Sequence, residues 1–469
     1  MVASRAGRLL QGLPVLLALA PFAPAARAVA WPDLPPAIHA RLAGAGVSAS
    51  TFDAFLSQLQ RTHAQRVREG DLDHLVFYLL QSTHFTRQPA IEPALSARAL
   101  VESLDAAPRS AYLQNGRVDE SHVGGDVRAR VRDLLRALDA TDQDPRLVYF
   151  RQLAAAALPH GREREAAVLH EYLRAMRFLY EKEFAARRTQ DPADAVAALY
   201  RSRGLSTDTA IEAGYAVHLG LGMVRSLEPG RRIRRVLIVG PGLDLAPRTA
   251  LIDATAPESY QPWTVLDALV SLGLSRLEDV EVVCADINPR VVAHLQHAHA
   301  APPTLTLISG LHQSPQLTLE PDYRAYFAGV GKAISLSDPS VTTADDRLVK
   351  VLRTNPAAAR RLSAVALDVV TQRLDAEPFD LTIATNILPY FDDVELALAM
   401  SNIAAMMATD GILLHNEPRP ALREITSALG VALELSRQAP IARVTGAPPL
   451  ADTIWLHRKR VSEAGRGRD

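Results

Sequence analysis

The sequence predicts a doubly wound α/β fold with a seven-stranded, mostly parallel sheet, and an all-helical domain in front of it. Two observations carry this prediction. Apolar residues recur at intervals of three and four through the first half of the chain, as amphipathic helices require. After Pro229-Gly230, short β-branched runs alternate with helical stretches, which is typical of a parallel sheet covered by helices on both faces.

The composition is that of a globular protein with a sizeable core. Of the 469 residues, 48% are hydrophobic and 22% are charged, and the net charge of −1 predicts no nucleic-acid partner. The single cysteine, Cys284, excludes a disulfide framework or a thiolate zinc site within one chain. His294, His297 and His299 have partial metal-ligand spacing but lack further ligands nearby, so we interpret them as a polar helix face and predict no metal site.

The first 28 residues have the layout of a secretory signal peptide. Two arginines precede the apolar run LPVLLALA, and small residues lead to Ala28. We therefore expect an exported, periplasmic or extracellular protein with no transmembrane helix in the mature chain. The alternatives are a retained membrane anchor and a cytoplasmic chain. At the other end, 461–469 is a polar tail.

Helical spacing defines the predicted N-terminal domain, 31–208. Helices are expected at 50–69 and 71–81, and amphipathic stripes run through 127–138 and 169–184. This half of the chain carries no recognisable chemical motif.

Five segments of the second half are apolar almost throughout, as strands buried on both faces are. They are RRVLIVG, VEVVCADI, SAVALDVV, FDLTIATN and GILLHNE. A helical segment, ALREITSALG, and two more strand candidates, ALELSRQA and DTIWLHRKR, follow. Because no helix separates the last two, we expect an antiparallel pair at the edge of the sheet.

The turn Gly240-Pro241-Gly242 follows the first strand, where a doubly wound sheet approaches its ligand most closely. Glycine there lets the backbone come close to a ligand or adopt a positive φ, although a plain strand-to-helix turn has the same composition. Asp286 ends the second strand, where it would accept hydrogen bonds from a ribose or serve as an N-cap or turn aspartate before Pro289. Asp368 ends the third strand, beside an adenine or as a cap.

The order of these segments resembles the class I S-adenosylmethionine-dependent methyltransferases, which have a Rossmann-like sheet. The most specific part, FDLTIATNILPYF, is similar to chemotaxis-receptor and small-molecule methyltransferases, and the resemblance covers 209–460. It implies S-adenosyl-L-methionine as cofactor, with the methionine portion at the glycine turn, the ribose at Asp286, the adenine near Asp368 and the sulfonium beside the loop after the fourth strand. The implied cofactor-binding residues are Gly240, Pro241, Gly242, Asp286, Ile287, Asp368, Asn386 and Ile387.

This sequence departs from the family pattern in three places. Ile238 stands where an acid is common, and Asp244 stands at the third glycine position. Gly242 and Asp286 are separated by about twice the ~20 residues of a tight strand-helix-strand unit. The extra length lies in an insertion, 243–262, which we expect to cap the pocket functionally.

A second insertion, 300–360, is expected to form a hairpin and a lid over the substrate. We expect its aromatic residues Tyr323, Tyr326 and Phe327 to form the core of the insertion rather than to face the substrate.

Methyl transfer demands little catalytic machinery, since the cofactor already carries an activated methyl group. The acceptor is a small molecule or a protein side chain, and Tyr390, His415 and Glu417 are the candidate bases or polar clamps. Each has a structural interpretation as well. Two other functions remain open: a non-catalytic binding or scaffold protein, and an NAD-dependent oxidoreductase, which the missing third glycine disfavours.

Overall fold

The largest sheet has eight strands, in the order β5-β12-β13-β11-β10-β2-β3-β8, in the computed structural model, which describes residues 24–460. The bounds are β2 Arg235–Val239, β3 Glu281–Asp286, β5 Leu317–Leu319, β8 Leu362–Ala366, β10 Phe379–Ala384, β11 Met407–His415, β12 Val431–Val444 and β13 Leu450–Lys459. The five strands from β8 to β11 in this order are parallel to one another, so the sheet is mostly parallel and doubly wound.

The count of eight corrects the predicted seven. The extra strand, β5, comes from the second insertion and pairs antiparallel with the outer end of β12. It thereby covers backbone groups that an edge strand would leave unpaired. The antiparallel pairing of β12 with β13 is confirmed, but β13 lies inside the sheet, because it also pairs antiparallel with β11.

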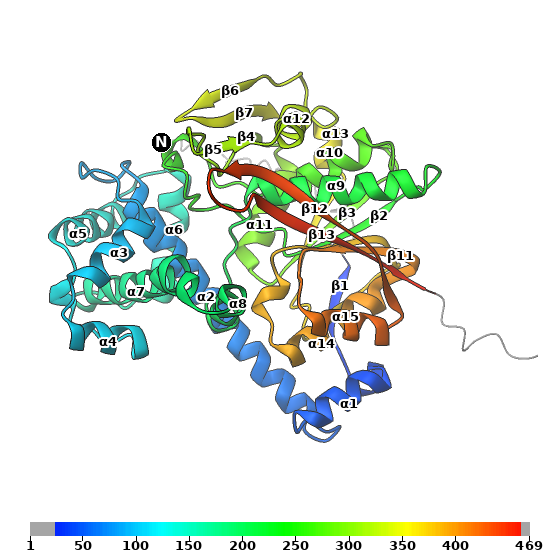
Figure 1. Ribbon diagram of the computed structural model, residues 1–469, viewed down its shortest axis with the longest axis horizontal. Helices are drawn as coiled ribbons and strands as arrows, with labels where there is room; N and C mark the ends of the chain where they lie inside the picture. Colours follow the sequence, from blue (N-terminus) through cyan, green and yellow to red (C-terminus); the bar gives the residue numbers. More distant parts are fainter. Residues whose placement is uncertain (1–23, 461–469) are drawn as a thin grey trace, which may run out of the picture.

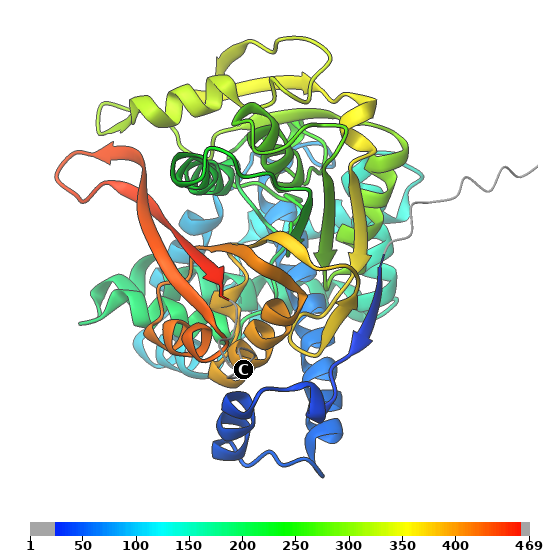
Figure 2. The ribbon, with the colours of Figure 1, turned by 90° about the vertical axis from the view of Figure 1, so that its right-hand side faces the viewer.

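Helices cover both faces of this sheet (Figures 1 and 2). α9 Ile211–Leu227, α10 Gln261–Ser271 and α11 Pro289–Ala300 pack on one face, and α14 Asp393–Met406 and α15 Pro420–Ala428 pack on the other. Val236 and Ile238 of β2 join the first core, whereas Leu237 and Val239 join the second. This alternation follows from the two-residue period of a strand.

Between Trp31 and Ser202 the described chain forms only helices. They are η1 Trp31–Asp33, α1 Pro36–Gly44, α2 Phe52–Gln81, α3 Pro93–Ser103, α4 Ala106–Asn115, η2 Glu120–His122, α5 Gly125–Asp139, α6 Pro145–Ala157, α7 Glu163–Tyr180, the π-helix η3 Glu181–Ala185, η4 Ala186–Arg188 and α8 Pro192–Ser202. In Figure 1, α3 to α7 stand to one side of the sheet.

α2 is one continuous helix of 30 residues, where the sequence predicted two separate helices at 50–69 and 71–81. Gly70 lies inside it. A Cβ at Gly70 would collide with the Leu205 carbonyl oxygen, so this glycine permits a close crossing of two segments rather than ending a helix.

The long helix α2 ties the two halves of the molecule together, since it is about 45 Å long. Its first turn and α1 pack on the sheet face of Leu237, and its last turns, around Leu79, belong to the core that the helical half shares with the opposite face of the sheet. Figure 2 shows α1 and the start of α2, in blue, beside the sheet rather than with the other helices. Both hydrophobic cores therefore contain residues from both sides of the predicted domain boundary at residue 208.

The second insertion forms a small antiparallel sheet, β4 Thr304–Ile308, β7 Arg347–Arg353 and β6 Val341–Ala344, with α12 Pro321–Gly329 and α13 Pro356–Ala359. Tyr323, Tyr326 and Phe327 are buried, which confirms that they are core residues.

The first insertion is held to the helical half by a buried arginine. Arg146 of α6 donates from Nε to the Leu245 carbonyl oxygen at 2.8 Å, and its other nitrogens donate to the carbonyl and hydroxyl oxygens of Thr255. Asp253, in the short helix η5 Ile252–Ala254, accepts a 2.6 Å hydrogen bond from the Ser82 hydroxyl. The insertion therefore bridges the sheet and the helices.

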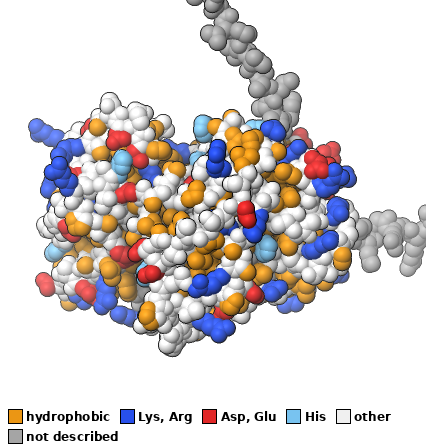
Figure 3. All heavy atoms as spheres, turned by 90° about the horizontal axis from the view of Figure 1, so that it is seen from above, with side chains coloured by type: hydrophobic (Ala, Val, Ile, Leu, Met, Phe, Trp, Pro, Cys, Tyr) orange, Lys and Arg blue, Asp and Glu red, His pale blue; other side chains and the backbone are white. Residues whose placement is uncertain are grey.

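The expected signal peptide falls mainly on residues 1–23, which lie outside the described residues, as does the polar tail. β1 Ala25–Ala28 pairs antiparallel with β9 Gln372–Asp375. No helix within 24–460 combines the length and the apolar character needed to cross a membrane. On the face shown in Figure 3, acidic and basic side chains are interspersed.

Candidate functional site

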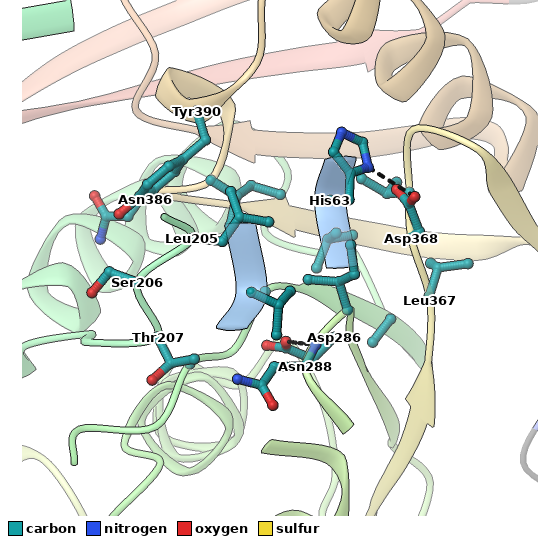
Figure 4. Close-up of a pocket in the computed structure, with 18 of the residues that line it drawn as sticks. His63, Leu205, Ser206, Thr207, Asp286, Asn288, Leu367, Asp368, Asn386 and Tyr390 are labelled. Atoms are coloured by element: carbon teal, nitrogen blue, oxygen red, sulfur yellow. Dashed lines mark hydrogen bonds and ion pairs between the residues drawn. The ribbon is translucent and has the colours of Figure 1, made fainter. Parts of the chain in front are cut away.

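A cavity lies where the strand order reverses beside β2. The chain runs from β2 outward to β3 and β8, and then returns to β10 on the other side of β2. In doubly wound sheets, ligands bind beyond the carboxyl ends of the strands at this point. The cavity there has an empty volume of about 710 Å³, part of it open to solvent. We call it the strand-end cavity, and Figure 4 shows its lining.

Seven of the eight predicted cofactor-binding residues line the strand-end cavity. They are Gly240, Gly242, Asp286, Ile287, Asp368, Asn386 and Ile387. Pro241 is the exception: it is buried but is not part of the lining. The structure therefore brings together residues from the ends of β2, β3, β8 and β10.

Neighbouring residues of the same chain pack closely against the glycine turn. Gly240 and Gly242 have φ values of +67° and +75°, a region that favours glycine. A Cβ on Gly240 would collide with Ile387, and one on Gly242 would collide with Thr207 and Thr209. The need for glycine thus comes in part from neighbouring residues, and not only from the approach of a ligand.

Asp286 ends β3 as a buried carboxyl group on the cavity wall. Its Oδ1 accepts a 2.8 Å hydrogen bond from the backbone N–H of Asn288. Asn288 itself caps α11, because its side chain accepts from Arg290 N–H, so Asp286 is not the helix cap. The alternative of a turn aspartate is confirmed, since Asp286 accepts from the N–H two residues on. Burial raises the pKa of Asp286 to about 7, with the nearby Asp71 adding to the shift.

Asp368 is paired with a histidine from the helical half. His63 of α2 donates from Nδ1 to Asp368 Oδ2 at 2.9 Å and from Nε2 to Glu395 Oε1 at 3.0 Å. Burial favours the neutral imidazole, but the hydrogen bonds to the two carboxylates outweigh it and raise the pKa of His63 to about 9. At neutral pH, an imidazolium therefore bridges the carboxylates of Asp368 and Glu395, and Figure 4 shows its bond to Asp368.

The wall that faces the sheet comes from the helical half and was not predicted from the sequence. Besides His63, it consists of Val67 of α2 and the crossing segment 205–209. The backbone N–H of Leu205 donates to the Arg66 carbonyl oxygen at 2.8 Å, which fixes this segment to α2. The hydroxyl of Thr207 donates to the Leu243 carbonyl oxygen at 2.8 Å, which fixes it to the glycine turn.

Asn386 has a left-handed backbone conformation, with φ at +62°. Asparagine tolerates this region better than most residues, and such outliers cluster at functional sites. Asn416, after β11, holds the conformation in place: its side chain accepts from Asn386 N–H at 2.9 Å and donates to Asn386 Oδ1 at 2.7 Å.

Of the three candidate bases, only Tyr390 lines the cavity. Burial raises its pKa to about 12, so its phenol stays protonated and acts as a donor rather than a base. His415 is buried in a parallel stack with Trp455, and Glu417 accepts a hydrogen bond from Arg419 N–H at 3.0 Å. Neither His415 nor Glu417 belongs to the described lining, so a role of either as a base or clamp stays a prediction.

Neither insertion covers the strand-end cavity, contrary to expectation. The described lining includes no residue of 300–360 and none of 243–262. α2 and the segment 205–209 cover the strand-end cavity instead. The first insertion contributes Arg248 to the lining of a neighbouring cavity.

Comparisons with known proteins are limited to solved structures, because no family model and no curated protein matches the chain. The N-methyltransferase NodS of Bradyrhizobium japonicum WM9, in complex with S-adenosyl-L-homocysteine, is 12% identical, with a TM-score of 0.27, over 60% of this chain and 98% of its own. The magnesium protoporphyrin IX methyltransferase ChlM of Synechocystis PCC 6803, with bound SAM, is 11% identical, with a TM-score of 0.29, over 58% and 99%.

TrmN of Thermus thermophilus is 13% identical, with a TM-score of 0.27, over 53% of this chain and 52% of its own. These identities and TM-scores are too low to transfer a function, so any assignment must come from the residues of this chain.

Proposed function

We propose that the chain is a class I S-adenosylmethionine-dependent methyltransferase. One observation carries the proposal: residues from the ends of four parallel strands converge on a single cavity in the order that this cofactor requires. Asn386 lies toward one end, Asp286 lies between, and Asp368 lies at the other end (Figure 4). The glycine turn belongs with Asn386, because a Cβ on Gly240 would meet the next residue, Ile387.

The site residues have distinct roles in this proposal. Ionised Asp286 accepts hydrogen bonds from the ribose hydroxyls, and His63 keeps Asp368 oriented at the adenine end. Apolar side chains of α2 and the crossing segment, Val67 and Leu205, exclude water. When bound, S-adenosylmethionine supplies an activated methyl group, so alignment of the acceptor contributes much of the rate.

The arrangement of the sheet disfavours the oxidoreductase alternative. A dinucleotide-binding sheet continues with a sixth parallel strand after the fifth. Here the antiparallel strand β13 lies between β11 and β12. The glycine turn also lacks a third glycine.

Calorimetric titration with S-adenosylmethionine, S-adenosylhomocysteine and NAD tests the proposal. We expect both sulfur compounds to bind and NAD not to bind. Replacing Asp286 by alanine removes two charge-assisted hydrogen bonds and should weaken binding at least tenfold, on the order of 1.5 kcal/mol or more. The surface variant Asp279→Ala is the matched control and should bind normally.

Two results would overturn the proposal. Binding of neither sulfur compound at high micromolar concentration would favour the scaffold alternative, and binding of NAD alone would favour the oxidoreductase. Normal affinity in Asp286→Ala would remove that residue from the site.

We further propose that residues 1–28 direct export, as the sequence pattern suggests. Cleavage after Ala28 would remove strand β1 and expose the edge of β9. A reporter fused after residue 35 should be active only outside the cytoplasm, and mass spectrometry of the secreted chain should give its first residue. Reporter activity in the cytoplasm would contradict export.

A further inference from the structure

A second cavity adjoins the strand-end cavity. It has an empty volume of about 880 Å³, part of it open to solvent, and the two share Ser206, Asn386 and Tyr390. Under the proposed function, Asn386 lies beside the sulfonium, so the second cavity opens next to the methyl group. Figure 4 shows Ser206, Asn386 and Tyr390 together at the end of the strand-end cavity that is away from Asp368.

Aromatic rings form much of the wall of this second cavity, which we call the aromatic cavity. The rings of Phe178 and Tyr200 meet edge to face with centroids 6.0 Å apart, and those of Tyr200 and Tyr390 do so at 5.4 Å. Phe77 adds a fourth ring. Such surfaces favour a flat apolar ligand, because aromatic contacts are worth about 0.5–1.5 kcal/mol beyond the area that they bury.

Three cationic side chains line the aromatic cavity, each close to an aromatic ring. The guanidinium carbon of Arg203 lies 4.0 Å from the Phe178 ring centroid. Lys182 Nζ lies 5.8 Å from the centroid of Tyr200, and the guanidinium carbon of Arg248 lies 5.7 Å from that of Phe77. Cations in this position bind and orient anionic groups while the rings hold the apolar part of the ligand.

Acidic neighbours cancel only part of this positive charge, because Asp73 pairs with Arg203 but is shared with Arg174. Asp208 is the one acidic residue in the described lining, and it lies 3.3 Å from His74. Burial opposes ionisation of Asp208, but the charge of His74 prevails and lowers its pKa, so the two form their own ion pair. Glu183 lies 3.4 Å from Lys182 and 4.0 Å from Arg248, and one acid cannot neutralise both.

Arg203 has an unused donor. One of its terminal nitrogens donates to Asp73 at 2.9 Å, and its side chain is only 10% exposed. Its Nε is buried and has no hydrogen-bond partner among residues 24–460. Because a buried donor without a partner is costly, this nitrogen is available to a ligand that supplies an acceptor, although other buried arginines leave Nε unpaired too.

The three cationic residues lie in segments that are neither α-helix nor β-strand. Lys182 lies in the π-helix η3, and π-helical turns occur frequently at functional sites. Arg248 comes from the first insertion, and Arg203 follows α8, two residues before the crossing segment 205–209. The parts of the chain that depart from a minimal doubly wound domain therefore meet at this cavity.

We propose that the aromatic cavity is the acceptor site and that the acceptor is a small aromatic molecule bearing an anionic group, a carboxylate or a phosphate. The identification of the cavity as an acceptor site rests on the proposed function. The preference for an aromatic anion rests on Arg203, Lys182, Arg248 and the rings around them.

Four naphthalene probes of similar size test this preference: 2-naphthoate, 2-naphthyl phosphate, neutral 2-naphthamide and cationic 2-naphthylmethylammonium. Their affinities are measured by calorimetry with the full chain. We expect at least one anion to bind about tenfold or more tightly than the amide, and the cation to bind most weakly. The anion with the higher affinity shows whether the site prefers a carboxylate or a phosphate.

The double variant Lys182→Gln/Arg248→Gln tests the location. It should weaken anion binding about tenfold and leave the binding of the amide unchanged, because the rings remain. Arg276→Gln, an exposed arginine outside both cavities, is the control. Arg203→Lys is a second variant, which keeps the positive charge but loses Nε. It should also weaken the binding of the anionic probe.

Three outcomes would overturn the proposal: equal affinity for anion and amide, unchanged anion affinity in the double variant, or displacement of the anion by S-adenosylhomocysteine, which would place it in the strand-end cavity. S-adenosylmethionine titrated into the same variants separates the two proposals. Selective anion binding without any binding of S-adenosylmethionine would refute the methyltransferase function and retain the anion site.

Discussion

Asp286 is a buried acid whose protonation should control cofactor affinity. Its pKa is raised to about 7, and only the carboxylate accepts hydrogen bonds from both ribose hydroxyls. We therefore expect the affinity for S-adenosylhomocysteine to fall as the pH drops below 7, approaching tenfold for each pH unit. Calorimetry between pH 5.5 and 8 measures this.

Asp286→Asn is the control for this titration, because the amide does not ionise in that range. Its affinity should be lower and nearly independent of pH. A wild-type affinity that stays constant between pH 5.5 and 8 would contradict the role of Asp286.

His63 should stabilise the folded chain in its charged form. Its pKa is about 9 in the structure, against an ordinary value of 6.5. The stabilisation is thus fully present below pH 6.5 and is lost as the pH rises through 9. His63→Gln removes the charge that lies between two buried carboxylates, and we expect it to cost about 3 kcal/mol of stability at pH 7.

Thermal unfolding of the two proteins at pH 6.5 and 9.5 checks this prediction. The difference between the midpoints of wild type and His63→Gln should be large at the lower pH and should shrink at the higher one. The exposed-site variant His160→Gln should unfold as wild type does. A difference that does not depend on pH would indicate that His63 acts by packing alone.

At the scale of elements, α2 shows why half of the site could not be predicted from the sequence. The ends of β2, β3, β8 and β10 can be placed from apolar runs, because a doubly wound sheet brings them to one edge. The wall formed by α2 depends on contacts across the chain, such as His63 with Asp368, and no local pattern encodes those. One signal was available: Asp71 and His74 interrupt the apolar end of a long helix, and both are buried.

The hydrogen bonds of Arg146 should keep the first insertion in its folded conformation. Replacing Arg146 by methionine removes the hydrogen bonds to Leu245 and Thr255 from a buried site. We expect faster hydrogen exchange across 243–258, with little change in the strands of the main sheet, because the loss is local. Uniform acceleration throughout the chain would instead mean global destabilisation, and no acceleration would show that Arg146 does not hold the insertion.

At the scale of the whole molecule, the helical half completes the site. The sequence predicted a sheet followed by its closing pair, and this part of the prediction is confirmed. Neither insertion covers the strand-end cavity as predicted, because the first reaches the neighbouring aromatic cavity through Arg248 and the second packs elsewhere. The crossing segment at Thr207 lies over the strand-end cavity instead. Insertion lengths can be read from a sequence, but the surface on which an insertion packs is fixed only by tertiary contacts.

A crystal structure with S-adenosylhomocysteine tests the central claim most directly. The methyltransferase function predicts the ribose within hydrogen-bonding distance of Asp286, the adenine at the His63 and Asp368 end, and the sulfur beside Asn386 where the two cavities meet. A ligand bound elsewhere, or in the reverse orientation with its adenine at Asn386, would contradict it.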